Sequence, residues 1–484
     1  MEYRLSFLNP WWENPDWKLG GGLKYKRKEF KKIMDCLKKI RRIPLLVGPR
    51  RVGKTTLLLQ IAEHFLDIIP SKNILYYSFE RADPEVSHTA DALETLIATW
   101  GGQIFESKKP RLLLLDEVQN VKQWGPRIKS LFDIHSNNLS PISVVITGSS
   151  SFDLLGQALL ALHGVVRHIA IPPFSFTDLW RMKYPDDVAL IDQISDWRSA
   201  WWSAKTHHYF GETIHVKIMH DEFWRKADIL QKNWLKKGGF PEFWNEDPLV
   251  VENEMLDYFV RRIAYEDILL ERGLSNPLEI SRFLKYCYFN PGIELNVTSA
   301  SQELGIPRST LDLALDLLHK AGYIRILPRY GGGKLRQKHV KIYPIDHALI
   351  PFGLRMENGK PTGYALETMV VNAFAELPNS ELFYFRKKEG KTIHEIDLIV
   401  ENPTKLIVIE IKKVISTENI GSLKEKFRNI TNYFPKKPTH QILVGWHHDG
   451  KAWPSGDELN IFKEKAIEVF PLWKIALGLF NNKI

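Results

Sequence analysis

The chain has 484 residues, 44% of them hydrophobic and 25% charged, and a formal net charge of +9 at pH 7. This composition excludes a disordered or fibrous chain, and the length predicts several domains rather than one core. Only Cys36 and Cys287 are present, which excludes a disulfide framework or a paired-cysteine zinc site and predicts a reducing, cytoplasmic location. No stretch approaches the roughly 20 apolar residues that span a bilayer, so no membrane partner is expected.

Residues 24–42 form a basic stretch with helical spacing, directly before the first predicted strand. A solvated helix face and a nucleic-acid contact both explain such a stretch. We favour the solvated face.

The next feature is a match to the P-loop pattern G-x-x-x-x-G-K-[ST], between an apolar run at residues 43–47 and a helix predicted over residues 56–66. In that context the glycines let backbone N–H groups surround a phosphate at the positive end of the helix. Lys54 would reach the β- and γ-phosphates, and the Thr55 hydroxyl would ligate Mg²⁺. The predicted nucleotide-binding residues are Gly48, Pro49, Arg50, Arg51, Val52, Gly53, Lys54, Thr55 and Thr56.

Four leucines lead into two adjacent carboxylates, Asp116 and Glu117. This run predicts a buried strand with acids at its carboxyl end, the edge at which open α/β sheets bind ligands. Asp116 would hold the magnesium ion, and Glu117 would orient or deprotonate the water that attacks the γ-phosphate. ATP hydrolysis is therefore predicted, against the alternative that Asp116 only caps the next segment. Further strands are predicted over residues 73–79, 142–147 and 165–171, which makes five.

Two polar features belong to the last two of these strands. Ser149 lies in a run of small hydroxyl residues where a side chain would sense the γ-phosphate. Arg167 is suited to stabilising charge on the transferred phosphoryl group, in its own subunit or across an interface. An exposed ion-pair arginine is an equal alternative for Arg167.

Residues 184–237 are unusually aromatic. Core packing or a surface for a protein partner explains their tryptophans better than base stacking does. The tryptophans are Trp197, Trp201, Trp202, Trp224 and Trp234.

A helix, a glycine turn and a second helix are predicted over residues 297–320. Strands at residues 324–327 and 340–343 flank a glycine-rich tip, which is the plan of a winged helix-turn-helix. A cationic wing is suited to DNA phosphates, although such modules also serve as spacers or protein-docking modules. The predicted DNA contacts are Arg308, Arg325, Arg329, Lys334, Arg336 and Lys338.

Two strand-like runs, residues 395–400 and 405–413, are joined by a turn-type linker and predict a hairpin. With residues 402–403 at its tip, Asp397 would lie opposite Val408, and Glu410 would be its diagonal neighbour on the face that also carries Lys412. A slip of one residue would turn Asp397 to the other face.

Such a cluster of charges on an apolar hairpin predicts a divalent metal and a polarised water, because isolated buried charges are costly. An upstream helix would contribute Glu367, so the predicted metal ligands are Glu367, Asp397 and Glu410. An ion-pair network at a solvent edge is the alternative.

Together these motifs resemble the archaeal ATPase family, over most of the chain. The residues that carry the resemblance are Asn9–Trp12, the P-loop, Asp116–Gln119, Thr147–Ser150, Pro173–Phe176, Lys237–Glu242, and Glu367 with Asp397, Glu410 and Lys412. The resemblance implies an AAA-like P-loop core of the additional-strand, catalytic-glutamate class, with a helical lid, a winged helix and a restriction-endonuclease-like domain. In active members of that nuclease superfamily the acids bind Mg²⁺ or Mn²⁺ and the lysine, here Lys412, positions the attacking water.

The predicted fold class is therefore α/β, a P-loop NTPase with a parallel central sheet. The predicted domains are an ATPase core (residues 1–172), a lid with an aromatic-rich insertion (173–275), a winged helix-turn-helix (276–350) and a restriction-endonuclease-like α/β domain (351–484). The expected cofactors are ATP and Mg²⁺, with Mn²⁺ as a further option at the nuclease-like site, and the expected partners are DNA and a second copy or another protein at the lid.

The predicted function is a nucleotide cycle coupled to DNA binding and to metal-dependent DNA cleavage. The alternative is an ATP-controlled signalling or assembly switch in which the nuclease-like domain is a non-catalytic docking module.

Overall fold

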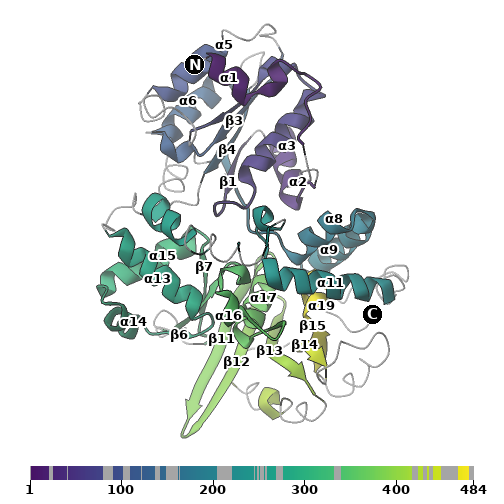
Figure 1. The fold of residues 1–484 in the computed structure, drawn as a ribbon, viewed down its shortest axis with the longest axis vertical. Coiled ribbons are helices and arrows are strands. Elements are labelled where there is room, and N and C mark those ends of the chain that lie inside the picture. The colour runs from purple at the N-terminus through teal and green to yellow at the C-terminus, as the bar shows by residue number, and fades with distance from the viewer. Residues whose placement is uncertain are drawn as a thin grey trace. The chain divides into compact units, whose positions relative to one another are not determined.

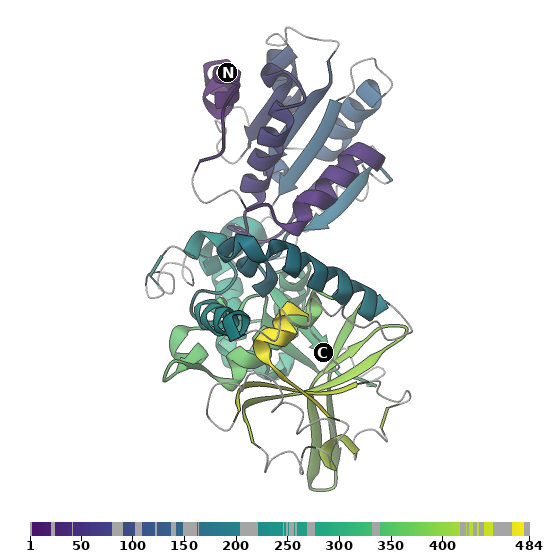
Figure 2. The same cartoon turned by 90° about the vertical axis from the view of Figure 1, so that its right-hand side faces the viewer.

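The computed structural model describes residues 2–20, 25–40, 42–79, 91–101, 109–121, 123–136, 142–148, 162, 164–203, 221–244, 246–247, 250, 256, 259–268, 276–331, 339–416, 423, 425–428, 433–434, 440–448 and 467–478. The chain forms two compact units (Figures 1 and 2). The first contains Met1–Pro172, Tyr265–Ser275 and Lys320–Gly322, and the second contains the remainder. None of the helices in these residues combines the length and apolar character needed to cross a membrane.

The first unit is built on the five predicted strands, which form one parallel sheet in the order β2-β3-β4-β1-β5. Most of their side chains are buried on both faces, because helices cover both sides of the sheet (Figures 1 and 2). The strands are β1 (Ile43–Val47), β2 (Ile74–Ser78), β3 (Arg111–Asp116), β4 (Ile142–Gly148) and β5 (Val166–Ala170). The helices are α1 (Glu2–Leu8), α2 (Lys28–Asp35), the π-helix η2 (Cys36–Ile40), α3 (Lys54–Leu66), α5 (Ala92–Gly101) and α6 (Trp124–Ser136).

The edge of this sheet at β2 is covered by the N-terminal segment. The Asn9 amide exchanges hydrogen bonds with Tyr76, donating to its carbonyl over 3.0 Å and accepting from its N–H over 2.6 Å. The indoles of Trp11 and Trp12 both donate to the Ile74 carbonyl, over 3.0 and 2.8 Å. The exposed row of backbone groups on an edge strand is thereby satisfied within the chain.

The second unit contains the predicted helix-turn-helix and its strand pair. Gly305 ends the first helix with φ 63°, a left-handed conformation that glycine adopts without strain. A short third strand completes an antiparallel sheet in the order β6-β8-β7. The elements are α13 (Pro277–Phe289), β6 (Glu294–Leu295), α14 (Val297–Leu304), α15 (Arg308–Lys320), β7 (Ile324–Pro328) and β8 (Val340–Pro344).

A mixed five-stranded sheet follows, in the order β11-β12-β13-β14-β15, with β11, β12 and β13 antiparallel and β13, β14 and β15 parallel. Its long β11–β12 hairpin is prominent in Figure 1. The strands are β11 (Glu381–Glu389), β12 (Thr392–Glu401), β13 (Leu406–Ile415), β14 (His440–His448) and β15 (Glu468–Pro471), with α17 (Gly363–Ala375) and α19 (Leu472–Leu477) packed against them. The remaining short elements are η1 (Pro10–Trp12), η3 (Ser71–Asn73), η4 (Val118–Asn120), η5 (Pro185–Asp187), η6 (Pro241–Phe243), η7 (Ile263–Ile268), η9 (His347–Leu349), α16 (Phe352–Arg355), β9 (Met356–Glu357) and β10 (Lys360–Pro361).

The predicted β12–β13 hairpin is present, but its register differs from the prediction by two residues. Val408 pairs with Ile399, not with Asp397. The reason is a wider turn, in which the Asn402 side chain accepts from the N–H groups of Thr404 and Lys405 over 2.8 and 2.6 Å. Because two is a full period of a strand, the faces of the side chains are unchanged.

The aromatic helices share a core with this sheet. The helices are α8 (Phe176–Lys183), α9 (Val188–Ser203) and α11 (Asp221–Lys237), and their tryptophans are buried together with residues of α17, β12, β13, β14 and α19. The Trp202 indole donates to the Pro378 carbonyl over 2.7 Å, and Asn402 donates to the Trp202 carbonyl over 2.9 Å. Core packing of the tryptophans is thus confirmed, and the predicted lid packs with the C-terminal sheet in one unit.

Candidate functional site

The P-loop follows β1 directly, and its two glycines have separate structural reasons. A Cβ on Gly48 would lie 2.1 Å from the Ile171 carbonyl oxygen, so no larger residue fits next to that backbone. Gly53 precedes α3 with φ 94°, a left-handed conformation. The loop therefore ends at the N-terminus of α3, where backbone N–H groups can bind a phosphate, as the motif predicts.

Lys54 is buried and folds back over this loop. Its Nζ donates to the Gly48 and Pro49 carbonyls over 2.9 and 3.0 Å and lies 3.8 Å from Glu117 Oε1. A phosphate bound in the loop would offer Nζ a stronger, charged acceptor than these carbonyls.

The predicted magnesium ligands lie side by side. The Thr55 hydroxyl donates to Asp116 Oδ2 over 2.7 Å. The Tyr76 hydroxyl also donates to Oδ2, over 3.2 Å, and the Thr147 hydroxyl donates to Oδ1. Burial raises the pKa of Asp116, and Glu117 raises it further, while the hydroxyls of Thr147 and Thr55 and the charge of Lys54 oppose the shift. Neutral donors thus hold a buried carboxylate next to Thr55, an arrangement that a divalent cation would complete.

Glu117 is held in an uncommon backbone conformation, with φ 55° and ψ 49°. Its N–H donates to the Thr147 hydroxyl over 3.3 Å, and Gln119 donates to its Oε2. A strained residue fixed by its surroundings at a sheet edge is typical of functional sites. Gln119 ends the Asp116–Gln119 motif, whereas Tyr76 belongs to no motif in the sequence and is brought here only by the fold.

A further buried arginine, Arg27, braces the loop. Its guanidinium donates to the Val52 carbonyl over 2.9 Å and to the Pro172 carbonyl over 2.7 Å, and its Nε pairs with Glu29 at 2.8 Å. The basic stretch that contains it was interpreted as a solvated face, which does not hold for this residue. The backbone acceptors of Arg27 are distant in sequence, so the pattern alone did not reveal them.

Arg167 lies away from this edge in its own chain. It is exposed on the edge strand β5 and pairs with Pro44, whereas Val47, the last residue before the P-loop, pairs with Ala170. Three residues along a strand span about 10 Å. The geometry does not favour a role in the same subunit, and a role across an interface stays a prediction. Ser149 lies outside the described residues.

The second cluster surrounds Glu410, which is fully buried on β13. Its Oε1 accepts from Lys412 Nζ over 2.7 Å and from Lys426 Nζ over 2.6 Å. Its Oε2 is buried with no hydrogen-bond partner among the described residues. A buried carboxylate oxygen of this kind needs a donor or a cation.

Asp397 lies next to it, since the register that pairs Leu398 with Ile409 continues toward Glu410. One Asp397 oxygen accepts from the Ile411 N–H over 2.8 Å. Burial, followed by the charges of Glu410 and Glu367, raises the pKa of Asp397 to about 7.

Strand β8 contributes two more side chains to this cluster. Lys341 Nζ lies 3.0 Å from Glu395 Oε1, and the Tyr343 hydroxyl donates to Glu367 Oε2 over 3.1 Å. Burial acts to lower the pKa of Lys341, but the carboxylates of Glu367, Glu395 and Asp397 outweigh it and raise the pKa. The second unit therefore balances its acids with lysines from several elements.

The predicted metal set fits this cluster only in part. Glu410 Oε2 and the Asp397 carboxylate are suited to a divalent cation. Among the described residues, however, no three His, Cys, Asp or Glu side chains form a group that could hold an ion as they stand. Lys412 and Lys426 lie next to Glu410 instead. The role of Glu367, Asp397 and Glu410 as metal ligands therefore stays a prediction.

The predicted DNA contacts are dispersed. Arg325 donates to Asn372 on α17 over 3.0 Å, and burial lowers its pKa to about 10. Arg329 forms a parallel bridge with Tyr384 of β11, and Arg308 is exposed and 3.5 Å from Asp312. Lys334, Arg336 and Lys338 lie outside the described residues.

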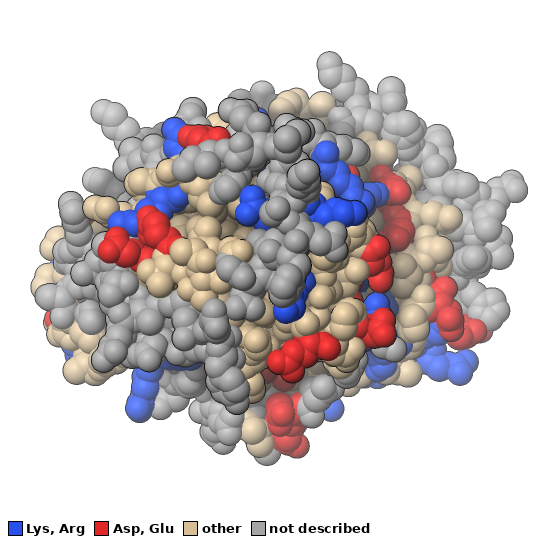
Figure 3. Space-filling view, turned by 90° about the horizontal axis from the view of Figure 1, so that it is seen from above, with Lys and Arg blue, Asp and Glu red and all other residues tan. Residues whose placement is uncertain are grey.

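On the face seen in Figure 3, the described charges of both signs are interspersed, without a continuous basic band. Arg325 of the wing is engaged with Asn372 of α17, so this residue gives no support to a DNA-binding surface.

The site around the P-loop lies within a stretch that matches a known family. Residues 40–180 match a family described as an AAA domain, a range that contains the P-loop, Asp116, Glu117 and Thr147. This stretch is similar to the AAA domains of P-loop ATPases. Residues 229–359 match a family described as a domain of unknown function.

Relatives extend over most of the chain. An uncharacterized protein of Methanocaldococcus jannaschii is 24% identical over 451 residues, which cover 90% of this chain and 88% of that protein. An uncharacterized protein of Haemophilus influenzae is 25% identical over 405 residues, 80% of this chain and 88% of that protein.

Among solved structures, the Walker-type ATPase of Pyrococcus abyssi covers 69% of this chain and 96% of its own, with 17% identity and a TM-score of 0.40. The Orc1 protein of Aeropyrum pernix in complex with DNA covers 69% and 93%, with 11% identity and a TM-score of 0.29. With TM-scores this low, the assignment of the first domain depends on the family match and on the geometry above.

Proposed function

We propose that the first unit binds ATP with Mg²⁺ and hydrolyses it. The observation that carries the proposal is the hydrogen bond between Thr55 and Asp116, with Glu117 fixed beside them. The P-loop N–H groups and Lys54 would bind the phosphates, and Thr55 and Asp116 would hold the magnesium ion. The ion would neutralise charge that develops on the transferred phosphoryl group.

Glu117 would orient the attacking water and accept its proton. Its carboxylate lies at the sheet edge near Lys54, and its backbone is fixed by Thr147. General-base catalysis of this kind contributes typically 10²–10⁴-fold to a rate.

The test compares Glu117→Gln and Lys54→Ala with wild type, using phosphate release and binding of a fluorescent ATP analogue. We expect Glu117→Gln to lose at least about 100-fold in hydrolysis while it still binds the analogue. Lys54→Ala should lose binding. Hydrolysis by Glu117→Gln at the wild-type rate would contradict the assigned role of Glu117.

A second candidate function concerns the Glu410 cluster, because Glu410 Oε2 is buried without a partner among the described residues. Glu410 and Asp397, with Glu367, would hold Mg²⁺ or Mn²⁺, and Lys412 would position a water for phosphodiester cleavage in DNA. A bound metal would supply Lewis-acid activation of that water.

The rival is an ATP-controlled assembly switch in which this domain only docks, and the lysines around Glu410 favour it. Labelled single-stranded, duplex and branched DNA would be incubated with Mg²⁺ or Mn²⁺, with and without ATP. Cleavage that Glu410→Gln abolishes supports the nuclease, with Glu357→Gln at an exposed pair as the control. Absence of cleavage with every substrate, together with ATP-dependent association of the chain, supports the switch.

A further inference from the structure

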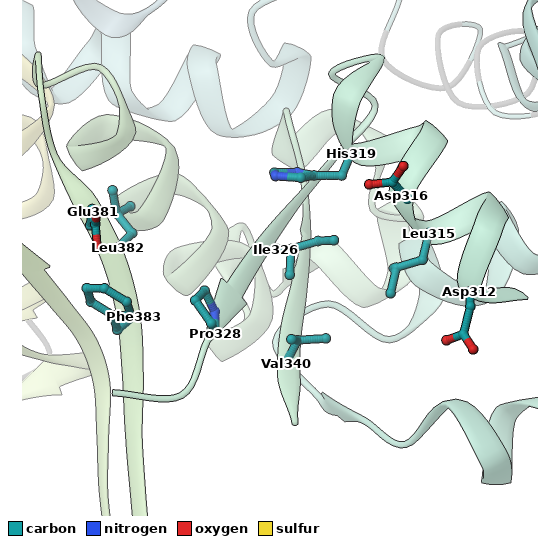
Figure 4. Close-up of a pocket in the computed structure, with 10 residues that line it drawn as sticks. All are labelled: Asp312, Leu315, Asp316, His319, Ile326, Pro328, Val340, Glu381, Leu382 and Phe383. Carbon is teal, nitrogen blue, oxygen red and sulfur yellow. The ribbon is translucent and has the colours of Figure 1, made fainter. Parts of the chain in front are cut away.

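A groove of about 840 Å³ lies between α15, β7 and β11 in the second unit. Figure 4 shows β11 on one side, α15 on the other, and β7 with β8 between them. The volume is within the roughly 300–1,000 Å³ of ordinary ligand-binding clefts. The groove is therefore large enough for a short segment of another molecule.

The groove lies in the fork between two edge strands. Among the described strands, β7 and β11 each end the order of their own sheet. They meet at a parallel bridge between Arg329 and Tyr384, where the Tyr330 N–H donates to the Tyr384 carbonyl over 2.8 Å. The groove residues of both strands, 326 and 328 on β7 and 381–383 on β11, all precede this bridge.

An edge strand presents backbone donors and acceptors on its outer side, so an extended peptide can pair with it. The fork offers two such edges that run in the same direction and separate from a common point. A strand inserted there would continue the pairing that the Arg329–Tyr384 bridge begins. Backbone geometry thus favours an extended ligand over a globular one.

The lining indicates the chemistry of that ligand. Its floor is apolar, with the side chains of Leu315, Ile326 and Leu382 only half-buried. Three exposed carboxylates, Asp312, Asp316 and Glu381, lie around it.

Residues 312, 315, 316 and 319 share one face of α15. The 3.5 Å pair between Arg308 and Asp312 is exposed to solvent, with side chains 60% and 53% accessible, so a ligand cation can replace Arg308 at little cost. Carboxylates at these positions repel phosphates and attract lysine or arginine.

We propose that this groove binds an extended, positively charged segment of a protein partner, which adds as a strand along the edge of β11 ahead of Tyr384. Apolar side chains of the segment pack against Leu315 and Leu382, and its cationic side chains face Asp312, Asp316 and Glu381. The site is separate from both carboxylate clusters, and the proposal does not depend on ATP hydrolysis or metal binding.

The test measures binding of a fluorescent nine-residue peptide, in which lysine alternates with valine, to the full chain by anisotropy. The matched peptides carry glutamate in place of lysine, or N-methylated valines that cannot donate to a strand. We expect the lysine peptide to bind at least tenfold tighter than either. The double variant Asp312→Lys/Asp316→Lys should weaken its binding about tenfold, and Glu303→Lys, exposed on α14 and outside the groove, should change it less than twofold.

Several results would overturn the proposal. No binding of the lysine peptide to wild type, equal binding of the glutamate peptide, or an equal effect of Glu303→Lys would refute the cationic ligand. Equal binding of the N-methylated peptide would refute strand addition. Self-association in sedimentation that the double variant abolishes, without peptide binding, would make a second copy of the chain the occupant.

Discussion

Asp116 in the first unit and Glu410 in the second are both buried carboxylates on strands, yet different groups surround them. Asp116 accepts from the hydroxyls of Thr55, Tyr76 and Thr147. Glu410 accepts from two lysine ammonium groups. The hydroxyl donors are neutral and Lys54 offsets only part of the charge of Asp116, so that site can still accept a cation. The lysines cancel much of the charge of Glu410, so a metal must displace or share them.

The largest effect is expected when both lysines at Glu410 are removed. Lys412→Met/Lys426→Met would leave the buried Glu410 without its cations. We expect a loss of about 2–3 kcal/mol in the free energy of unfolding, below the roughly 3–5 kcal/mol of a fully buried pair because both lysines are partly exposed. Urea denaturation followed by tryptophan fluorescence measures it, since many buried tryptophans lie in the second unit.

The control is Lys387→Met/Lys413→Met, which removes two exposed ion pairs. If Mn²⁺ stabilises the Lys412→Met/Lys426→Met variant more than wild type, the lysines occupy the place of a metal. An unchanged stability in that variant would show that they do not balance Glu410.

The corresponding change in the first unit is Thr147→Val, which keeps the shape and removes one neutral donor. Asp116 would lose a hydrogen bond, and the Glu117 N–H would lose its acceptor. We expect a cost of about 1–3 kcal/mol, measured as faster hydrogen exchange in β3 and β4. Thr99→Val, at an exposed helical site, should cost less than about 0.5 kcal/mol. Equal effects of the two variants would show that Thr147 has no special role in holding Asp116 and Glu117.

The stability of the second unit should depend on pH through Asp397. The folded pKa of Asp397 is about 7, above its ordinary value of 3.8. Between these pH values the folded chain binds a proton that the unfolded chain has released. Protonation of Asp397 therefore contributes to the free energy of unfolding at low pH, and this contribution is lost as pH rises toward 7. Its slope is at most about 1.4 kcal/mol per pH unit.

Urea midpoints of wild type and Asp397→Asn between pH 5 and 8 would reveal this slope. We expect wild type to lose stability more steeply than Asp397→Asn up to about pH 7, and the two to run parallel above it. Parallel curves throughout would contradict a raised pKa.

The smallest effect is expected for Arg308→Gln. Its ion pair with Asp312 is exposed, so stability should change by less than about 0.5 kcal/mol. Binding of duplex DNA, measured by anisotropy at low salt, should also stay within about twofold. A large loss of DNA binding would restore Arg308 as a phosphate contact.

Local patterns predicted much of this molecule. The P-loop and the five strands of the first sheet follow from spacing and apolar runs. Thr55 and Asp116 were predicted as two ligands of one magnesium ion, and the structure places them within hydrogen-bond distance. The shared face of Asp397, Glu410 and Lys412 was predicted in spite of a wrong register, because a slip of two residues preserves side-chain alternation. The turn itself was misjudged, since Asn402 caps a wider loop.

Residue types over a few neighbouring positions are enough to identify the side chains that can bind phosphate and a cation. The groups that surround each charge follow from the packing of distant segments. Lys341 and Arg325 are basic residues of the kind expected in a DNA-binding wing. In the structure, however, Lys341 pairs with Glu395 and Arg325 donates to Asn372 on α17. Arg27 looks like part of a solvated helix but braces the P-loop. Such environments arise between segments far apart in the chain, and burial and the neighbouring charges then set the role of each ionisable side chain.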